Sequence, residues 1–248
     1  MAPEKRVGGE SPLRKSANST KKSKVTHKKG DPRPTFSAPG DVVTFYVTED
    51  GEEQKFVIHR EYVCHYSPVL KAAFNSNFIE GQTGEYRLDD ITHGTFNLLV
   101  QWLYHQKVDL AHLKSGFNEK NDLAILTEEK LNLFQLWVLA DKFSIPGLQN
   151  CVVDHIREGA NLNDRDFLFP VKAYDYVYNN TAPDSPLRRL VVMLTGAYLD
   201  KGDIKSNADN FPRQMLTDLL LFTVEKAGDI DVGQSEIEDG CYVPLENK

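Results

Sequence analysis

The chain has 248 residues, of which 40% are hydrophobic and 26% are charged, and these fractions are ordinary for a globular protein. The net charge of −7 combines two opposite parts. Residues 1–34 carry ten basic and three acidic residues, a net +7, and the remainder carries 19 basic and 33 acidic residues, a net −14. The three cysteines, Cys64, Cys151 and Cys241, are widely spaced, which excludes a disulfide framework and a cysteine-rich zinc site.

The two ends of the chain differ from its body. We expect residues 1–40 to be a disordered basic tail, because small, polar and basic residues dominate it and its few aliphatic residues follow no period. Residues 226–248 are acidic and contain glycine, so we expect a flexible tail there. The sequence shows no secretory signal and no run of ~18 apolar residues. The expected location is therefore intracellular, in the nucleus, the cytoplasm or both, with no membrane partner.

The body is expected to begin with a β-hairpin and to end in helices. Asp50-Gly51 favours a tight hairpin turn, because glycine tolerates positive φ angles. Ser67-Pro68 and Ser185-Pro186 each mark a helix start, because serine caps free N–H groups and proline suits the first helical position. Strands are expected at 42–47, 55–58 and 85–88, and helices at 61–65, 68–74, 92–105, 127–142, from 146, about 167–178, 186–198 and 212–220.

The spacing of apolar residues indicates which helix faces are buried. The helix at 92–105 has one apolar face, and the helix at 127–142 has two, so the latter should lie deep in the core. Residues 106–128 are polar and irregular and are expected to form a long loop, with a short strand at 108–110 as an alternative. In the last helices the predicted inward residues are Phe167, Val171, Tyr174, Tyr178, Leu187, Leu190, Val191, Leu194, Tyr198, Met215, Leu216, Leu219 and Leu220.

An ordered set of short motifs runs through residues 41–158. The motifs are Asp41-Val42, Phe56-Val57-Ile58-His59-Arg60, Tyr66-Ser67-Pro68-Val69-Leu70 with Ala72, Ala73 and Phe74, Leu88-Asp89-Asp90 with Phe96 and Leu103-Tyr104, and Leu139-Ala140-Asp141-Lys142-Phe143 with Ile145-Pro146-Gly147-Leu148. Together they resemble the BTB/POZ family. The segment from Tyr176 to Leu190 resembles one in many fungal BTB proteins of unassigned function.

The resemblance implies an α+β fold, in which a small three-stranded sheet is covered by a cluster of helices, followed by an all-helical C-terminal extension over residues 159–225. It also implies action through surfaces rather than catalysis, with no cofactor. Many family members form homodimers through the first strand and first helix, and the corresponding candidates here are Val43, Phe45, Val63 and Tyr66. A charged groove in dimeric members corresponds to Asp41 and Arg60, which could equally be a local fold-stabilising pair.

Some family members are adaptors of a cullin ubiquitin ligase. The resemblance places that surface on Tyr104, His105, Val108, Leu110 and Phe134. Adaptors often carry a hydrophobic-x-Glu motif in this loop, and the segment from Val108 to Leu110 lacks the Glu. This departure weakens the adaptor interpretation.

The basic tail contains a cluster of lysines, Lys21, Lys22, Lys24, Lys28 and Lys29. The cluster is a candidate nuclear import signal, a non-specific contact for nucleic acid or a solvated linker. Phe36 is the only aromatic residue of the tail, and the lack of stacking aromatics argues against nucleic-acid recognition.

Catalytic chemistry finds little support in the sequence. Cys64 and His65 are neighbours on an expected helix and point about 100° apart, so they do not form a nucleophile–base pair. The histidines lack the spacing of zinc ligands, and no glycine-rich phosphate loop occurs. The sequence therefore predicts a non-enzymatic scaffold that self-associates and recruits partner proteins. A cullin adaptor and a nuclear transcription or chromatin co-regulator remain alternatives.

Overall fold

The computed structural model describes residues 33–111, 122–162, 169–198 and 208–227, together with positions 202 and 206. Spatial contacts divide the chain into residues 1–32 and residues 33–248, and every described residue belongs to the second unit. The tail expected over 1–40 thus lies largely outside the described residues, as do most of the expected loop at 106–128 and of the tail at 226–248.

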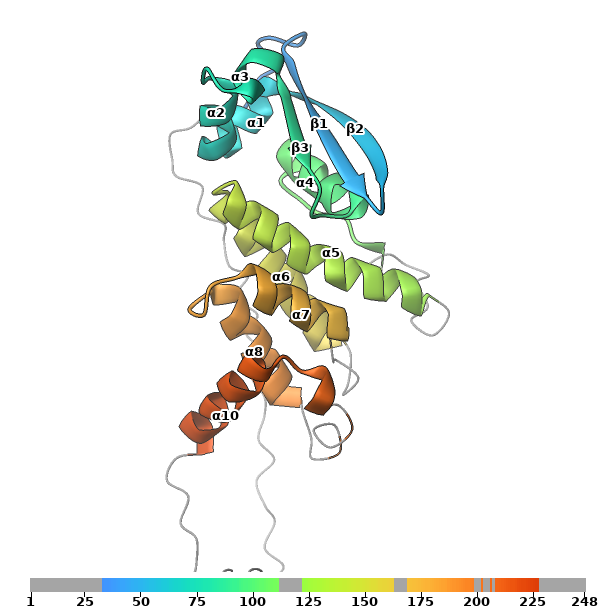
Figure 1. Cartoon of the computed structure of the whole chain (residues 1–248), viewed down its shortest axis with the longest axis vertical. Helices are drawn as coiled ribbons and strands as arrows, with labels where there is room; N and C mark the ends of the chain where they lie inside the picture. The colour runs from blue at the N-terminus through green and yellow to red at the C-terminus, as the bar shows by residue number, and fades with distance from the viewer. Residues whose placement is uncertain are drawn as a thin grey trace, which may run out of the picture. The chain divides into compact units, whose positions relative to one another are not determined.

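Three strands form one sheet in the order β2-β1-β3 (Figure 1). They are β1 (Val42–Glu49), β2 (Glu52–His59) and β3 (Glu85–Leu88). β1 pairs antiparallel with β2 and parallel with β3. In the hairpin turn, Asp50 and Gly51 have φ angles of 50° and 84°, the positive values of a type I′ turn. The predicted hairpin and third strand are confirmed.

Three short helices gather at one end of the sheet (Figure 1). They are α1 (Arg60–Tyr66), α2 (Pro68–Phe74) and α3 (Ile79–Thr83). Ser67 caps α2, because its hydroxyl oxygen accepts the Leu70 N–H at 3.0 Å, and it donates to the Phe143 carbonyl oxygen at 2.7 Å. One buried serine therefore starts a helix and also joins that helix to a distant part of the chain.

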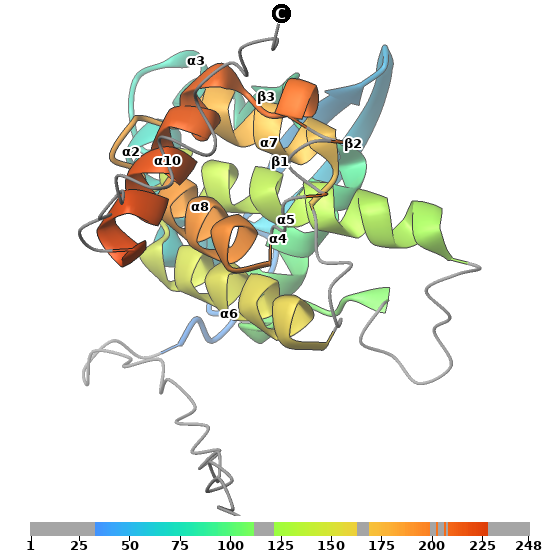
Figure 2. The same cartoon turned by 90° about the horizontal axis from the view of Figure 1, so that it is seen from below.

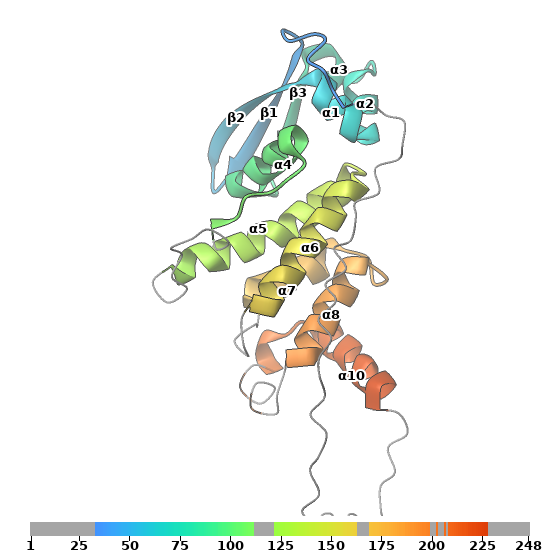
Figure 3. The same ribbon diagram turned by 180° about the vertical axis from the view of Figure 1, so that it is seen from behind.

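The remaining helices pack below the sheet. In the view from behind, α4 (His93–His105) crosses in front of the strands (Figure 3). α5 (Leu123–Lys142) contacts α4, α6 (Pro146–Leu162) and α7 (Val171–Asn180). α8 (Pro186–Tyr198) lies between α6 and α10 (Arg213–Ala227), and the short 3-10 helix η2 (Ala208–Asn210) precedes α10 (Figure 2).

This small sheet with many helices confirms the predicted α+β class and the helical C-terminal part. Among the described residues, no helix combines the length and apolar character that a membrane crossing needs. An aromatic contact joins the C-terminal part to α5, where the Phe169 and Phe134 ring centroids lie 4.9 Å apart in an edge-on arrangement. Within the C-terminal part, the Phe211 and Tyr174 ring centroids lie 5.3 Å apart.

Several details differ from the sequence-based expectations. α5 begins at Leu123 rather than near residue 127, because Leu126 is buried and extends the apolar face by one turn. Residues 108–110 are irregular rather than a strand. Three residues that we predicted to face inward are instead exposed, namely Val171, Leu216 and Leu220. Phe167 and the Tyr198 side chain lie outside the part that the structure describes.

Candidate interaction surfaces

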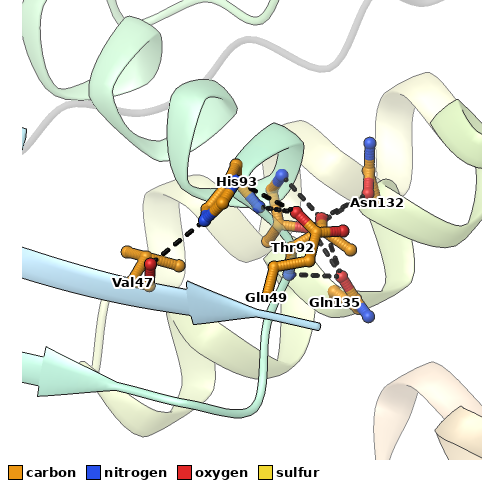
Figure 4. A network of polar contacts seen from close by, with 7 residues as sticks. Val47, Glu49, Thr92, His93, Asn132 and Gln135 are labelled. Atoms are coloured by element: carbon orange, nitrogen blue, oxygen red, sulfur yellow. Dashed lines mark hydrogen bonds and ion pairs between the residues drawn. The ribbon is translucent and has the colours of Figure 1, made fainter. Parts of the chain in front are cut away.

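A network of hydroxyl and amide groups joins the start of α4 to α5 (Figure 4). The Thr92 hydroxyl lies 2.7 Å from Asn132 Oδ1, and the Thr95 hydroxyl lies 2.7 Å from Gln135 Oε1. Each hydroxyl can therefore donate to a different amide oxygen. Thr92 Oγ1 also accepts the Thr95 N–H at 3.0 Å and caps α4. Because the members satisfy one another in the core, the network holds the two helices in one arrangement.

The start of α4 is tied to the sheet as well. The His93 N–H donates to Glu49 Oε2 at 2.7 Å, and the His93 ring Nε2 lies 3.1 Å from the Val47 carbonyl oxygen (Figure 4). Gly94 permits the close approach of α5, because a Cβ there would lie 2.6 Å from Asn132 Nδ2. Contacts on two sides thus position α4, whose far end carries Tyr104 and His105.

Residues 35–37, here called the strap, lie against α1 before β1 begins. The Thr35 N–H donates to Glu61 Oε1 at 2.8 Å, and the Ser37 N–H donates to Glu61 Oε2 at 2.9 Å. The Ser37 hydroxyl also donates to Oε2 at 3.2 Å. The hydrogen bond from Thr35 is the largest of several that lower the pKa of Glu61, because they favour its charged form. We had assigned residues 33–40 to a disordered tail, and the structure places them on the folded domain.

The aromatic cluster, defined as His59, Tyr62 and Tyr104, lies beneath the strap. The Phe36 ring centroid lies 5.0 Å from that of His59 and 4.8 Å from that of Tyr62. Phe36 has a φ of 57°, a left-handed conformation that costs a non-glycine residue about 1 kcal/mol. The residue is 46% exposed, so it covers the cluster without joining the core.

Asp41 and Arg60, the predicted charged groove, are neighbours in the structure. Their side chains approach to 4.0 Å, and the Arg60 N–H donates to the Asp41 carbonyl oxygen at 3.0 Å. Arg60 Nη2 also donates to the Phe74 carbonyl oxygen at the end of α2 at 2.5 Å. These contacts join β1, α1 and α2 to one another. A role of Asp41 and Arg60 as a charged groove for a partner stays a prediction.

The side chains that we predicted for a dimer interface lie mostly in the core. Val43, Phe45 and Val63 are at most 1% exposed, because they fill the space between the sheet and the helices. They cannot provide contact area to a partner in the folded protomer, so their predicted role needs correction. Tyr66 is half-buried, and its ring meets the Trp102 ring at 5.2 Å.

The residues predicted for a cullin surface are also partly buried and partly exposed. Val108, Leu110 and Phe134 are buried, with at most 4% exposed, and Phe169 covers Phe134 from the C-terminal side. His105 is exposed at the end of α4. The half-buried Tyr104 hydroxyl accepts the His59 N–H at 3.1 Å and lies 2.8 Å from His59 Nδ1, so it also supports α1. The predicted lysines of the import signal lie outside the described residues.

Burial disfavours the thiolate form of both described cysteines. Burial raises the pKa of the Cys64 thiol, and burial together with Asp154 and Glu158 raises the pKa of Cys151 to about 11. Within the described residues, no group of three or more His, Cys, Asp or Glu side chains could hold a metal ion.

Several exposed or paired residues were not found from the sequence. Exposed apolar side chains stand on β1, α2 and the start of α3, namely Val42, Val69, Phe78 and Ile79. The strap and Glu61 gave no local signal, since their contacts join residues about 25 positions apart. Two polar residues three positions apart, Asn132 and Gln135, interrupt an otherwise apolar helix. This interruption was the one feature of the sequence that could have indicated the α4–α5 network.

An α+β domain with exposed apolar side chains on its helices has the properties of a protein-interaction module. Residues 41–159 match the sequence model of the BTB/POZ domain, and this part of the chain is a BTB/POZ domain. Domains of this family are in general non-enzymatic interaction modules.

Among curated proteins, the chain is similar to mammalian forms of Kelch repeat and BTB domain-containing protein 4. The Homo sapiens protein is 27% identical over 136 residues, which cover 48% of this chain and 26% of the relative. The Mus musculus protein is 28% identical over 130 residues, which cover 45% of this chain and 24% of the relative. The chain thus spans about a quarter of the length of these relatives.

Proposed function

We propose that this protein is a non-catalytic scaffold that self-associates through its BTB/POZ domain and recruits partner proteins. The observation that carries the proposal is the exposure of large apolar side chains on α2 and at the start of α3, two helices in contact with each other. Val69 is 37% exposed and Phe78 is 74% exposed, although Leu70 and Phe74 between them are buried. Apolar side chains with a polar surround are typical of interfaces. A two-fold axis would bring the same side chains of both copies together.

Self-association is tested with the full chain by sedimentation velocity over a wide range of concentrations. We expect a dimer for the natural sequence and a monomer for Val69→Glu or Phe78→Glu, because each substitution would bury an unpaired carboxylate in the apolar interface. Val171→Glu is the matched control, since Val171 is similarly exposed, at 42%, but lies on α7. A folded natural chain that stays monomeric at every concentration excludes self-association.

A cullin adaptor is the second candidate. The observation in its favour is the surface position of His105 at the end of α4, in the part of the domain that family adaptors use. Calorimetry with the full chain and the N-terminal domain of the BTB-binding cullin tests it. Micromolar binding that is lost in His105→Glu and kept in Gln214→Glu supports the adaptor function. Absence of binding excludes it.

His105 is a sharper probe than Tyr104. Truncation of Tyr104 to alanine also removes the acceptor of the His59 N–H and one side of the aromatic cluster. If that variant lost binding, the loss could therefore come either from the missing Tyr104 contact with the cullin or from a disturbed α1.

A nuclear co-regulator is the third candidate, and it rests on the +7 charge of residues 1–34. If Lys21, Lys22, Lys24, Lys28 and Lys29 form an import signal, their joint change to glutamine should move a fluorescent fusion of the full chain out of the nucleus. An unchanged distribution leaves the segment as a linker.

A further inference from the structure

The strap is attached to the domain by exposed hydrogen bonds to Glu61 and by the ring contacts of Phe36. Its hydrogen bonds converge on the Glu61 carboxylate, which uses both oxygens as acceptors. Thr35, Phe36 and Ser37 are each exposed. A segment with few buried contacts opens locally at low free energy. The strap can therefore leave α1 without unfolding the domain.

We propose that Ser37 is a phosphorylation site and that a phosphate there releases the strap from the aromatic cluster. A protein kinase would transfer the γ-phosphoryl group of ATP to Ser37 Oγ. The new Oγ–P bond replaces the bond between the γ-phosphorus and the β,γ-bridging oxygen, ADP leaves with that oxygen, and the hydroxyl proton passes to a base on the kinase. This inference goes beyond the scaffold function, and no step of it requires self-association or a cullin.

The position of Ser37 suits a kinase. The residue lies in an irregular stretch before β1, with an exposed side chain, and kinases act on segments that can extend. Arg33 lies four residues before it, and Lys28 and Lys29 lie further upstream. These cations suit a kinase whose peptide groove is acidic. Ser67 differs, because its hydroxyl is buried and bonded to Phe143.

The contact with Glu61 determines what a phosphate does. The hydroxyl now donates to Oε2 at 3.2 Å, but a phosphate carries a charge of about −1.5 to −2 at neutral pH and offers only acceptors to a carboxylate. An attraction thus becomes a repulsion between like charges at short range. Arg60, the arginine of α1, is already engaged by Asp41 and by the Phe74 carbonyl oxygen.

Release of the strap changes the surface of the domain. With Phe36 removed, the ring faces of Tyr62, His59 and Tyr104 lose their cover. Tyrosine faces beside a carboxylate are typical contact surfaces for partner proteins. Phosphorylation at Ser37 would thus uncover an aromatic surface that the unmodified chain covers itself.

The test uses the full chain with phosphoserine inserted at position 37 during translation. The readout is the nuclear Overhauser contact between the Phe36 ring and the Tyr62 ring, whose centroids lie 4.8 Å apart. We expect the contact in the unmodified chain and its loss in the phosphorylated chain. Ser37→Ala is the control, and it should keep the contact because both backbone N–H groups still reach Glu61. Persistence of the contact beside the phosphate overturns the proposal.

Charge reversal distinguishes repulsion from a general disturbance. In Glu61→Lys the strap should be open without phosphate, because an ammonium faces N–H donors, and phosphoserine at position 37 should close it. Failure of this inversion overturns the electrostatic mechanism.

The site itself is tested by mass spectrometry after the full chain is incubated with ATP and a eukaryotic cell extract. Phosphate on Ser37 supports the assignment, and its absence from Ser37 overturns it.

Discussion

Both the BTB/POZ domain and the C-terminal helices secure the end of a helix with an arginine, but in different surroundings. In the domain, the partly exposed Arg60 donates to the Phe74 carbonyl oxygen after α2. In the C-terminal part, the buried Arg188 donates to the Tyr178 carbonyl oxygen at 2.7 Å and to the Thr181 carbonyl oxygen after α7. The Arg60 side chain is 29% exposed, whereas Arg188 is only 4% exposed. The C-terminal helices thus depend more on a single side chain than the domain does.

The largest expected effect is that of Arg188→Met. The substitution keeps an apolar stem but leaves buried carbonyl oxygens without a donor, and it removes a cation 4.5 Å from the Tyr178 ring. We expect the free energy of unfolding to fall by about 3 kcal/mol. Urea denaturation followed by circular dichroism measures it. The control is Arg189→Met on the adjacent, exposed residue, which should change stability by less than about 0.5 kcal/mol. Equal losses of stability in the two variants would show that the buried Arg188 matters no more than an exposed arginine.

The second prediction concerns the neutral network that joins α4 to α5 in the domain. In Gly94→Ala, the new Cβ would meet Asn132 Nδ2 at 2.6 Å, so Asn132 must move away from Thr92 and Thr95. We expect a loss of about 2 kcal/mol in the same measurement. The double variant Gly94→Ala/Asn132→Ala should show a favourable coupling, because the clash is gone. Strictly additive losses would mean that α5 does not approach Gly94 this closely.

Arg60→Met should have a smaller effect than either. The Arg60 side chain is 29% exposed, so water reaches part of the space that the substitution vacates. The 4.0 Å contact with the exposed Asp41 adds little, because such ion pairs are screened. We expect a loss of about 1 kcal/mol by the same denaturation experiment. A loss as large as that of Arg188→Met would show that the domain relies on its arginine as heavily as the C-terminal helices do.

The same contrast explains how far the sequence predicts the structure. The hairpin, the helix starts at Ser67-Pro68 and Ser185-Pro186 and the order of elements follow from local patterns, and the structure confirms them. The wrong assignments depend on long-range packing. Periodicity shows that Val171, Leu216 and Leu220 lie on apolar faces, but α8 covers only one side of α10 and leaves the last two exposed.

The candidate surfaces were harder to predict than the fold. Val43 and Phe45 alternate along β1 with side chains that face outward, and a shift of one residue moves a strand position from surface to core. Glu61 and the strap are far apart in the sequence. They meet because the chain turns between the strap and β1, where the Asp41 N–H donates to the Ala38 carbonyl oxygen at 3.0 Å.

The smallest expected effect concerns the strap and its dependence on pH. The hydrogen bonds from Thr35 and Ser37 lower the pKa of Glu61, so they favour the carboxylate and hold the strap while that group is charged. The bonds should be fully present above the ordinary glutamate pKa and be lost only as the pH falls through the lowered value. The intensity of the Phe36–Tyr62 nuclear Overhauser contact across an acid titration measures this. In Glu61→Gln the contact should be weak at every pH, because an amide offers one acceptor where the strap uses two. Release at or above the ordinary glutamate pKa would show that the carboxylate does not hold the strap, and Phe36 would then be held by its ring contacts alone.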